Sequence, residues 1–112
     1  MQVILLPEVL NYLEDLAVIL YKKGYFSFEE TSLKYIIELY DDIITTLPTR
    51  LHKPAPRYFD KYGNSMKYAV FRKSRNTSWY VFFKTYEKDS EKIFLIRYIG
   101  NNHTVAQYLT DD

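Results

Sequence analysis

The pattern of apolar and polar positions changes near residue 66, from helical spacing to short, dense apolar runs. Three runs rich in Tyr, Phe, Val and Ile follow, at residues 67–73, 79–86 and 92–99, and no proline interrupts them. β-Branched and aromatic residues suit a pleated strand, and the polar breaks between the runs have the length of hairpin loops. The pattern therefore predicts a three-stranded antiparallel meander.

The second and third runs are apolar at both alternating sets of positions. Val81 and Phe83 fall on one set, and Tyr80 and Phe82 fall on the other. A sheet that is apolar on both faces has to be covered on both, at least in part. The N-terminal half of the chain has the pattern needed to cover one of them.

That N-terminal half begins with a short apolar run at residues 2–6, which predicts a strand at an edge of the sheet. From Pro7, apolar residues recur at helical spacing as far as a Lys-Lys-Gly sequence at residues 22–24. Proline fits the first turn of a helix because the N–H it lacks has no partner there, and glycine after cations suits the C-terminal end. We expect a helix over residues 7–23.

A second helical pattern runs up to Pro48, which disfavours the helical conformation in the residue before it. Its start is indicated by Ser27 and Glu30, whose spacing is that of a capping box. Only a few residues join the two helices, so we expect an antiparallel hairpin.

These elements predict an α+β fold in a single domain over residues 1–112. An N-terminal strand and a two-helix antiparallel hairpin would pack on an antiparallel sheet of three to four strands. The 112 residues suit one domain by size. Residues 48–65 contain three prolines and form a long connection, and connections of this length are usually functional or mobile.

Charge divides the chain in two. Residues 1–47 hold three basic and eight acidic residues, whereas residues 48–112 hold twelve basic and six acidic ones. Such asymmetry is expected of a domain that presents one cationic face to a polyanion. A solvated sheet surface, with its charges partly paired to the acidic helices, is the alternative.

The long connection alternates basic and aromatic residues, a pattern that suits nucleic acid because cations meet phosphates and rings stack on bases. Alternatively, Leu51, Tyr58 and Phe59 attach this segment to the core while its charges stay in water. The predicted nucleic-acid-binding residues are Lys53, Arg57, Lys73 and Arg75.

Several kinds of chemistry are disfavoured by composition. The absence of cysteine excludes disulfides, thiolate metal sites and cysteine nucleophiles, and is compatible with a cytoplasmic location. A zinc site would require His52 and His103 to meet carboxylates, and isolated glycines provide no phosphate-binding loop. No apolar run approaches the roughly 20 residues that span a membrane, and the N-terminus does not resemble a signal peptide. We expect no metal, no cofactor and no membrane segment.

The order of these elements resembles the toxins of the RelE/ParE superfamily of type II toxin–antitoxin modules. Residues 68–72 (YAVFR) look like the arginine-bearing first meander strand of that family. Aromatic residues stand at 79–80, where members often carry a second arginine. Asn101 and Asn102 stand about where many members have a His-Arg pair, with His103 next and Tyr108 near the end.

For the RNA-cleaving branch, the resemblance implies metal-independent chemistry on an mRNA codon in the ribosomal A site. The ribose 2′-hydroxyl attacks the neighbouring phosphate, which requires a base, an acid and cations around the phosphate. Arg72 would stabilise the phosphate, His103 would exchange protons near neutral pH, and Tyr108 would stack or donate.

The resemblance implies a cognate antitoxin as partner, with ribosome-bound mRNA or DNA gyrase as target, and leaves a homodimer open. The gyrase-inhibiting branch lacks the catalytic groups, so a non-catalytic toxin is one alternative. A small RNA-binding or protein-binding adaptor without catalysis is another.

Overall fold

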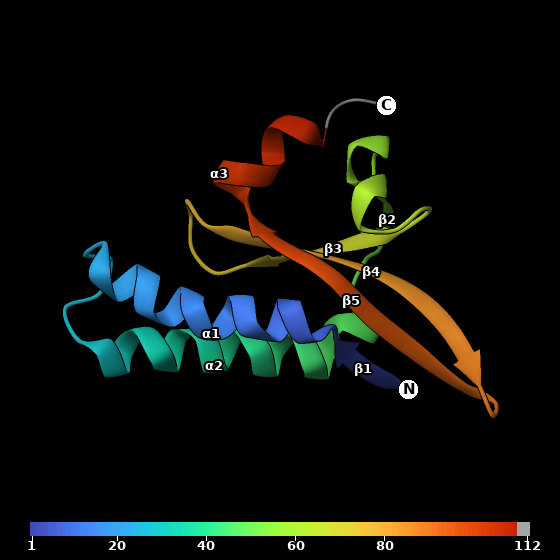
Figure 1. Cartoon of the computed structure of the whole chain (residues 1–112), viewed down its shortest axis with the longest axis horizontal. Helices are drawn as coiled ribbons and strands as arrows, with labels where there is room; N and C mark the ends of the chain where they lie inside the picture. The colour runs from blue at the N-terminus through green and yellow to red at the C-terminus, as the bar shows by residue number, and fades with distance from the viewer. Residues whose placement is uncertain (110–112) are drawn as a thin grey trace.

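The computed structural model describes residues 1–109, and the last three residues of the predicted domain, 110–112, lie outside the described part. It has an α+β fold in which a helical hairpin covers one face of a five-stranded sheet (Figure 1). The strands are β1 (Gln2–Leu5), β2 (Lys53–Pro54), β3 (Lys67–Arg72), β4 (Ser78–Lys88) and β5 (Glu91–Asn101), in the order β1-β5-β4-β3-β2. The predicted meander and the predicted edge strand are both confirmed.

The prediction of an antiparallel sheet of three to four strands was wrong, because the sheet is mixed and has a fifth strand. β1 runs parallel to β5, whereas β2, β3, β4 and β5 are antiparallel neighbours. Because β1 and β5 are separated by most of the chain, no tight hairpin turn requires them to be antiparallel. β2 is a pair of residues opposite Tyr68 and Lys67, which is too short to produce a recognisable pattern.

The β4–β5 hairpin extends past the rest of the sheet, as Figure 1 shows at its free end. The last pair between β3 and β4 joins Lys67 to Phe83, but the pairing of β4 with β5 continues from Lys84 to Lys88. The turn between them is tight, with positive φ angles of 53° at Asp89 and 67° at Ser90. Two successive left-handed residues match the right-handed twist of a two-residue hairpin.

The two long helices are α1 (Pro7–Lys22) and α2 (Glu29–Thr46), which lie side by side and antiparallel (Figure 1). The buried Ser32 hydroxyl donates to the Ala17 carbonyl oxygen at 2.5 Å and fixes how the helices align. A short 3₁₀ turn, η1 (Leu47–Thr49), follows α2. Within residues 1–109, no helix has the length and apolarity to cross a membrane.

The predicted capping box at Ser27 is wrong. Phe28 occupies the N-cap position, and no side chain caps the helix there. Because α2 begins at Glu29, Ser27 lies one residue too early for its hydroxyl to accept from the first free N–H groups. Glu29 and Glu30 instead place negative charge in the first turn, where the helix dipole favours it.

Both faces of the sheet are covered, as the double apolar pattern predicts. The helices pack on one face over Phe71, Val81 and Phe83. The other face is covered by a 3₁₀ segment, η2 (Arg57–Tyr62), and by the C-terminal α3 (Asn102–Val105) and η3 (Ala106–Tyr108). Its core consists of Phe59, Met66, Tyr68, Phe82 and Val105.

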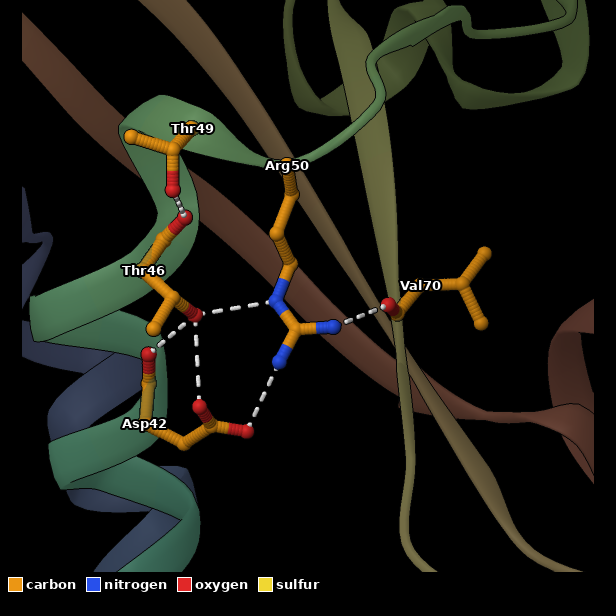
Figure 2. A network of polar contacts seen from close by, with 5 residues as sticks. All are labelled: Asp42, Thr46, Thr49, Arg50 and Val70. Atoms are coloured by element: carbon orange, nitrogen blue, oxygen red, sulfur yellow. Dashed lines mark hydrogen bonds and ion pairs between the residues drawn. The ribbon is translucent and has the colours of Figure 1, made fainter.

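Arg50 ties the end of α2 to β3, as Figure 2 shows. Its guanidinium forms an ion pair with Asp42 at 3.0 Å and donates to the Thr46 hydroxyl at 2.9 Å and the Val70 carbonyl oxygen at 3.2 Å. The same group lies 3.9 Å from the centre of the Phe71 ring. The planar guanidinium has several N–H donors, so one side chain can bind a carboxylate, a hydroxyl and a carbonyl oxygen together. These bonds fix the position of α2 relative to β3.

Candidate functional site

A cavity of about 290 Å³ lies where the turn of the helical hairpin approaches the β3–β4 loop and the end of β5. Figure 1 shows these three parts of the chain together at one end of the molecule. The side chains that give the cavity its chemistry are Lys23, Tyr25, Phe26, Tyr35, Lys73, Thr77, Trp79, Asn101 and His103.

The inner wall of this cavity is aromatic. Trp79 is 2% exposed, and its indole N–H donates to the Tyr35 hydroxyl at 2.9 Å. The Tyr35 ring in turn lies 5.3 Å from the ring of Phe26, measured between centres. Because Trp79 and Tyr35 come from β4 and α2, this hydrogen bond joins the helical hairpin to the sheet at the wall of the cavity.

Two asparagines place His103 at the rim. The Asn101 side chain accepts from the Thr104 N–H at 3.1 Å and so caps α3. The Asn102 side chain accepts from the Ser78 N–H at 3.0 Å and donates to the Asn76 carbonyl oxygen at 3.2 Å, which ties α3 to the β3–β4 loop. Asn101 and Asn102 therefore position His103 beside the loop that carries Lys73.

Lys73 reaches the cavity because of strand alternation. Ala69 and Phe71 of β3 face the helices, and Lys73 continues that set of positions. Its backbone N–H donates to the Thr77 carbonyl oxygen at 2.9 Å, which closes the β3–β4 loop. Residues 30 positions apart in the sequence, Lys73 and His103, thus line one cavity.

Arg72 and Tyr108 lie elsewhere. Arg72 belongs to the alternate set with Tyr68 and Val70, which face η2 and the C-terminal segment, and its Nε donates to the Ser74 carbonyl oxygen at 3.2 Å. Tyr108 stacks on Tyr58, with ring centres 3.6 Å apart. The expected grouping of Arg72, His103 and Tyr108 is therefore not formed by the contacts within residues 1–109.

The remaining predicted nucleic-acid-binding residues also divide between surfaces. Arg75 is exposed in the β3–β4 loop near the cavity, whereas Arg57 is exposed on η2. Lys53 on β2 lines a second cavity of about 300 Å³ together with Arg50, Leu51, Tyr68 and Val70. The expected single cationic face is not formed, because Lys73 and Arg75 belong to the β3–β4 loop beside the first cavity, whereas Lys53 and Arg57 belong to β2 and η2.

His52, a weak metal candidate in the sequence, has a structural role. Its Nε2 donates to the Leu47 carbonyl oxygen at 2.8 Å, and its ring packs edge-on against Phe83 and Phe94. In the described part of the chain, no group of three or more His, Asp or Glu side chains is arranged to hold a metal ion.

A tyrosine cluster joins η2 to the C-terminal segment on the face opposite the helices. Tyr62 stacks on Tyr98 with ring centres 4.1 Å apart, and Tyr58 stacks on Tyr108. The Lys61 ammonium lies 4.0 Å from the centre of the Tyr58 ring. A hydrogen bond with Lys61 lowers the pKa of Tyr58, and a hydrogen bond with Tyr58 raises the pKa of Tyr108.

Burial, with a smaller contribution from Tyr62, raises the pKa of Tyr98 from 10.0 to about 12. Between these values the unfolded chain releases the Tyr98 proton while the folded protein keeps it, so the free energy of unfolding falls as pH rises. We expect the free energy of unfolding of Tyr98→Phe to fall less than that of the wild type between pH 10 and about 12. Urea unfolding at a series of alkaline pH values measures this, and Tyr25→Phe, at a residue 70% exposed, is the control that keeps the wild-type slope. An unchanged slope in Tyr98→Phe would contradict the assignment.

The part of the cavity that the helical hairpin contributes was not predicted from the sequence. At Lys23 the sequence predicts the end of a helix and at Trp79 it predicts a strand, whereas Tyr35 falls between the apolar positions of the second helical pattern. Each interpretation is correct locally, but the packing of α1, α2 and β4 also brings the three residues to one cavity. The Lys22-Lys23 pair beside Tyr25 and Phe26, basic next to aromatic, is the signal that could have indicated it.

The fold and this cavity define an α+β protein with a cationic and aromatic site at one end of its sheet. No protein-family model, curated protein or solved structure matches the chain.

Proposed function

We propose that this protein is the toxin component of a type II toxin–antitoxin module of the RelE/ParE type, and that it cleaves mRNA in a ribosome-dependent manner. The observation that supports this most is the convergence of Lys73 and His103 on one aromatic-walled cavity. The order of elements, with an edge strand, a helical hairpin, a basic connection and a meander, agrees with the proposal. A cognate antitoxin and the ribosome are the partners that it implies.

The chemistry assigned to the cavity needs no metal. Lys73 and Lys23 hold the scissile phosphate and stabilise the extra negative charge that develops on it. The ribose 2′-oxygen forms a bond to phosphorus, and the bond from phosphorus to the 5′-oxygen of the next nucleotide breaks. His103 takes the proton of the attacking 2′-hydroxyl while a water molecule gives one to the leaving 5′-oxygen, or the histidine and water act in the opposite roles. Tyr25, which is 70% exposed at the cavity, stacks on a base.

The test is cleavage of an mRNA bound to ribosomes with a defined codon in the A site, followed by primer extension. We expect the wild type to cut at that codon and Lys73→Ala/His103→Ala to be slower by at least about a hundred-fold, because a general acid or base contributes roughly 10²–10⁴. Lys67→Ala/Lys88→Ala removes two cations on strands away from the cavity and should keep the wild-type rate.

Arg72→Ala distinguishes the site proposed at the cavity, Lys73 with His103, from the site expected from the sequence, which also included Arg72. If Lys73 and His103 form the site, Arg72→Ala loses less activity than Lys73→Ala. A larger loss for Arg72→Ala would instead restore the grouping of Arg72 with His103 and Tyr108. Equal cutting by the wild type and by Lys73→Ala/His103→Ala would refute a nuclease at the cavity.

The position of Arg72 and Tyr108 away from His103 favours one second candidate, a non-catalytic inhibitor of DNA gyrase. Induced expression separates the two: codon-positioned mRNA cuts identify the nuclease, whereas DNA damage with intact mRNA identifies the gyrase inhibitor. An RNA-binding or protein-binding adaptor would produce neither result.

A further inference from the structure

The helical hairpin carries apolar side chains on the surface that it turns away from the sheet. Leu10 and Val18 of α1 and Leu33 and Ile37 of α2 are 42%, 41%, 50% and 49% exposed. Their helical positions lie outside those of the buried residues, such as Leu13 and Ile36, that pack toward the core. We call this set of four residues the outer helical face.

The four side chains form one surface rather than four isolated positions. The hydrogen bond between Ser32 and Ala17 sets α1 and α2 side by side in antiparallel alignment. Val18 therefore lies near the level of Leu33, and Leu10 lies near the level of Ile37, on opposite sides of the groove between the helices. An apolar surface shared by two adjacent helices is the shape that accepts a third helix.

Acidic residues surround this apolar surface. The helices carry seven exposed carboxylates outside the Asp42–Arg50 pair, which is the single ion pair among residues 1–109. Helical spacing places Glu14, Glu30 and Asp41 next to the apolar positions. The exposed carboxylates are Glu8, Glu14, Asp15, Glu29, Glu30, Glu38 and Asp41, and the cations within the same helices are Lys22 and Lys34.

We propose that the outer helical face binds an amphipathic helix of a partner protein, one whose apolar stripe is flanked by lysine and arginine. The apolar side chains supply the buried area, and the carboxylates select basic flanks. A second copy of this chain would bring the same acidic residues against each other, which disfavours a symmetric helix-to-helix dimer. The inference is independent of the proposed function, because none of the four residues of the outer helical face lines the cavity that contains Lys73 and His103.

The probe is a fluorescent synthetic helical peptide of about 18 residues, with a leucine stripe flanked by lysines. Its binding to the full chain is measured by fluorescence anisotropy. We expect Leu33→Asp/Ile37→Asp to weaken binding at least about ten-fold. Leu51→Asp, at an apolar residue 76% exposed on the long connection, is the matched control and should bind as the wild type does.

Charge is tested separately, in case the aspartates disturb the helices. Glu14→Lys/Glu30→Lys keeps the apolar residues and should also weaken binding, and higher salt should weaken binding to the wild type. A peptide with glutamate flanks, or one with the same residues scrambled, should not bind. Equal binding of the variants, or of the scrambled peptide, would overturn the proposal. So would a wild-type dimer in sedimentation that Leu33→Asp/Ile37→Asp dissociates, because the face would then belong to a second copy.

Discussion

Replacement of Phe59 by alanine is expected to lower the free energy of unfolding by about 3–5 kcal/mol. Phe59 is 1% exposed and stacks on Phe82 of β4 with ring centres 4.3 Å apart. It also meets the rings of Tyr58 and Tyr108 nearly edge-on. Since this ring is the largest buried side chain of η2, its loss leaves a cavity between the sheet and the segment that covers its second face.

Urea unfolding monitored by circular dichroism measures the effect of Phe59→Ala. Tyr58→Ala is the matched control, because it removes a neighbouring ring that is 40% exposed, and it should cost much less. If the two variants were equally stable, η2 would not be anchored through Phe59. The covering of the second face would then depend on the C-terminal segment.

Replacement of Arg50 by alanine is expected to cost about 2 kcal/mol, more than an ordinary surface ion pair. The change removes the ion pair with Asp42, the hydrogen bonds to Thr46 and Val70, and the packing of the guanidinium over Phe71. It also leaves Asp42, which is 31% exposed in its side chain, without its cation. Chemical unfolding of the variant gives the value.

Arg50→Lys separates geometry from charge. Lysine keeps the positive charge but lacks the fork that reaches three acceptors, so we expect it to recover less than half of the loss. Full recovery by lysine would show that the charge alone matters. A loss below about 0.5 kcal/mol in Arg50→Ala would show that the network contributes no more than exposed ion pairs do.

The strands and helices could be predicted closely because their apolar residues are dense and periodic. The predicted helix over residues 7–23 corresponds to α1 (Pro7–Lys22), and each predicted meander run overlaps one strand. The cap of α2 was predicted wrongly at Ser27, whereas the N-cap residue is Phe28. The spacing of Ser27 and Glu30 fits a capping box, but this spacing alone does not fix the residue at which a helix begins. β2 was not predicted because a strand of two residues is too short to show an alternation of apolar and polar positions.

The site could be predicted only in part, for a reason that lies in the sheet itself. Alternation along a strand shows that the side chains of Arg72 and Lys73 lie on opposite faces of the sheet. Because the strands are apolar on both faces, the sequence does not show which of the two side chains lies on the face covered by the helices. Packing decides this, and it brings Lys73 to His103 while Arg72 points to the other side. Lys23 and Trp79 join the cavity through contacts between distant segments, which no local pattern in the sequence reports.

The projecting end of the β4–β5 hairpin leaves the outer side of residues 84–88 without a neighbouring strand in the described structure. Backbone N–H and C=O groups that are unpaired at the edge of a sheet can form hydrogen bonds with strands of other molecules and so start aggregation. Lys84, Glu87 and Lys88 lie along this edge, and a strand added there would have to bring their charges against its own side chains. The chain can therefore extend a long hairpin into solvent while resisting edge-to-edge assembly into larger sheets.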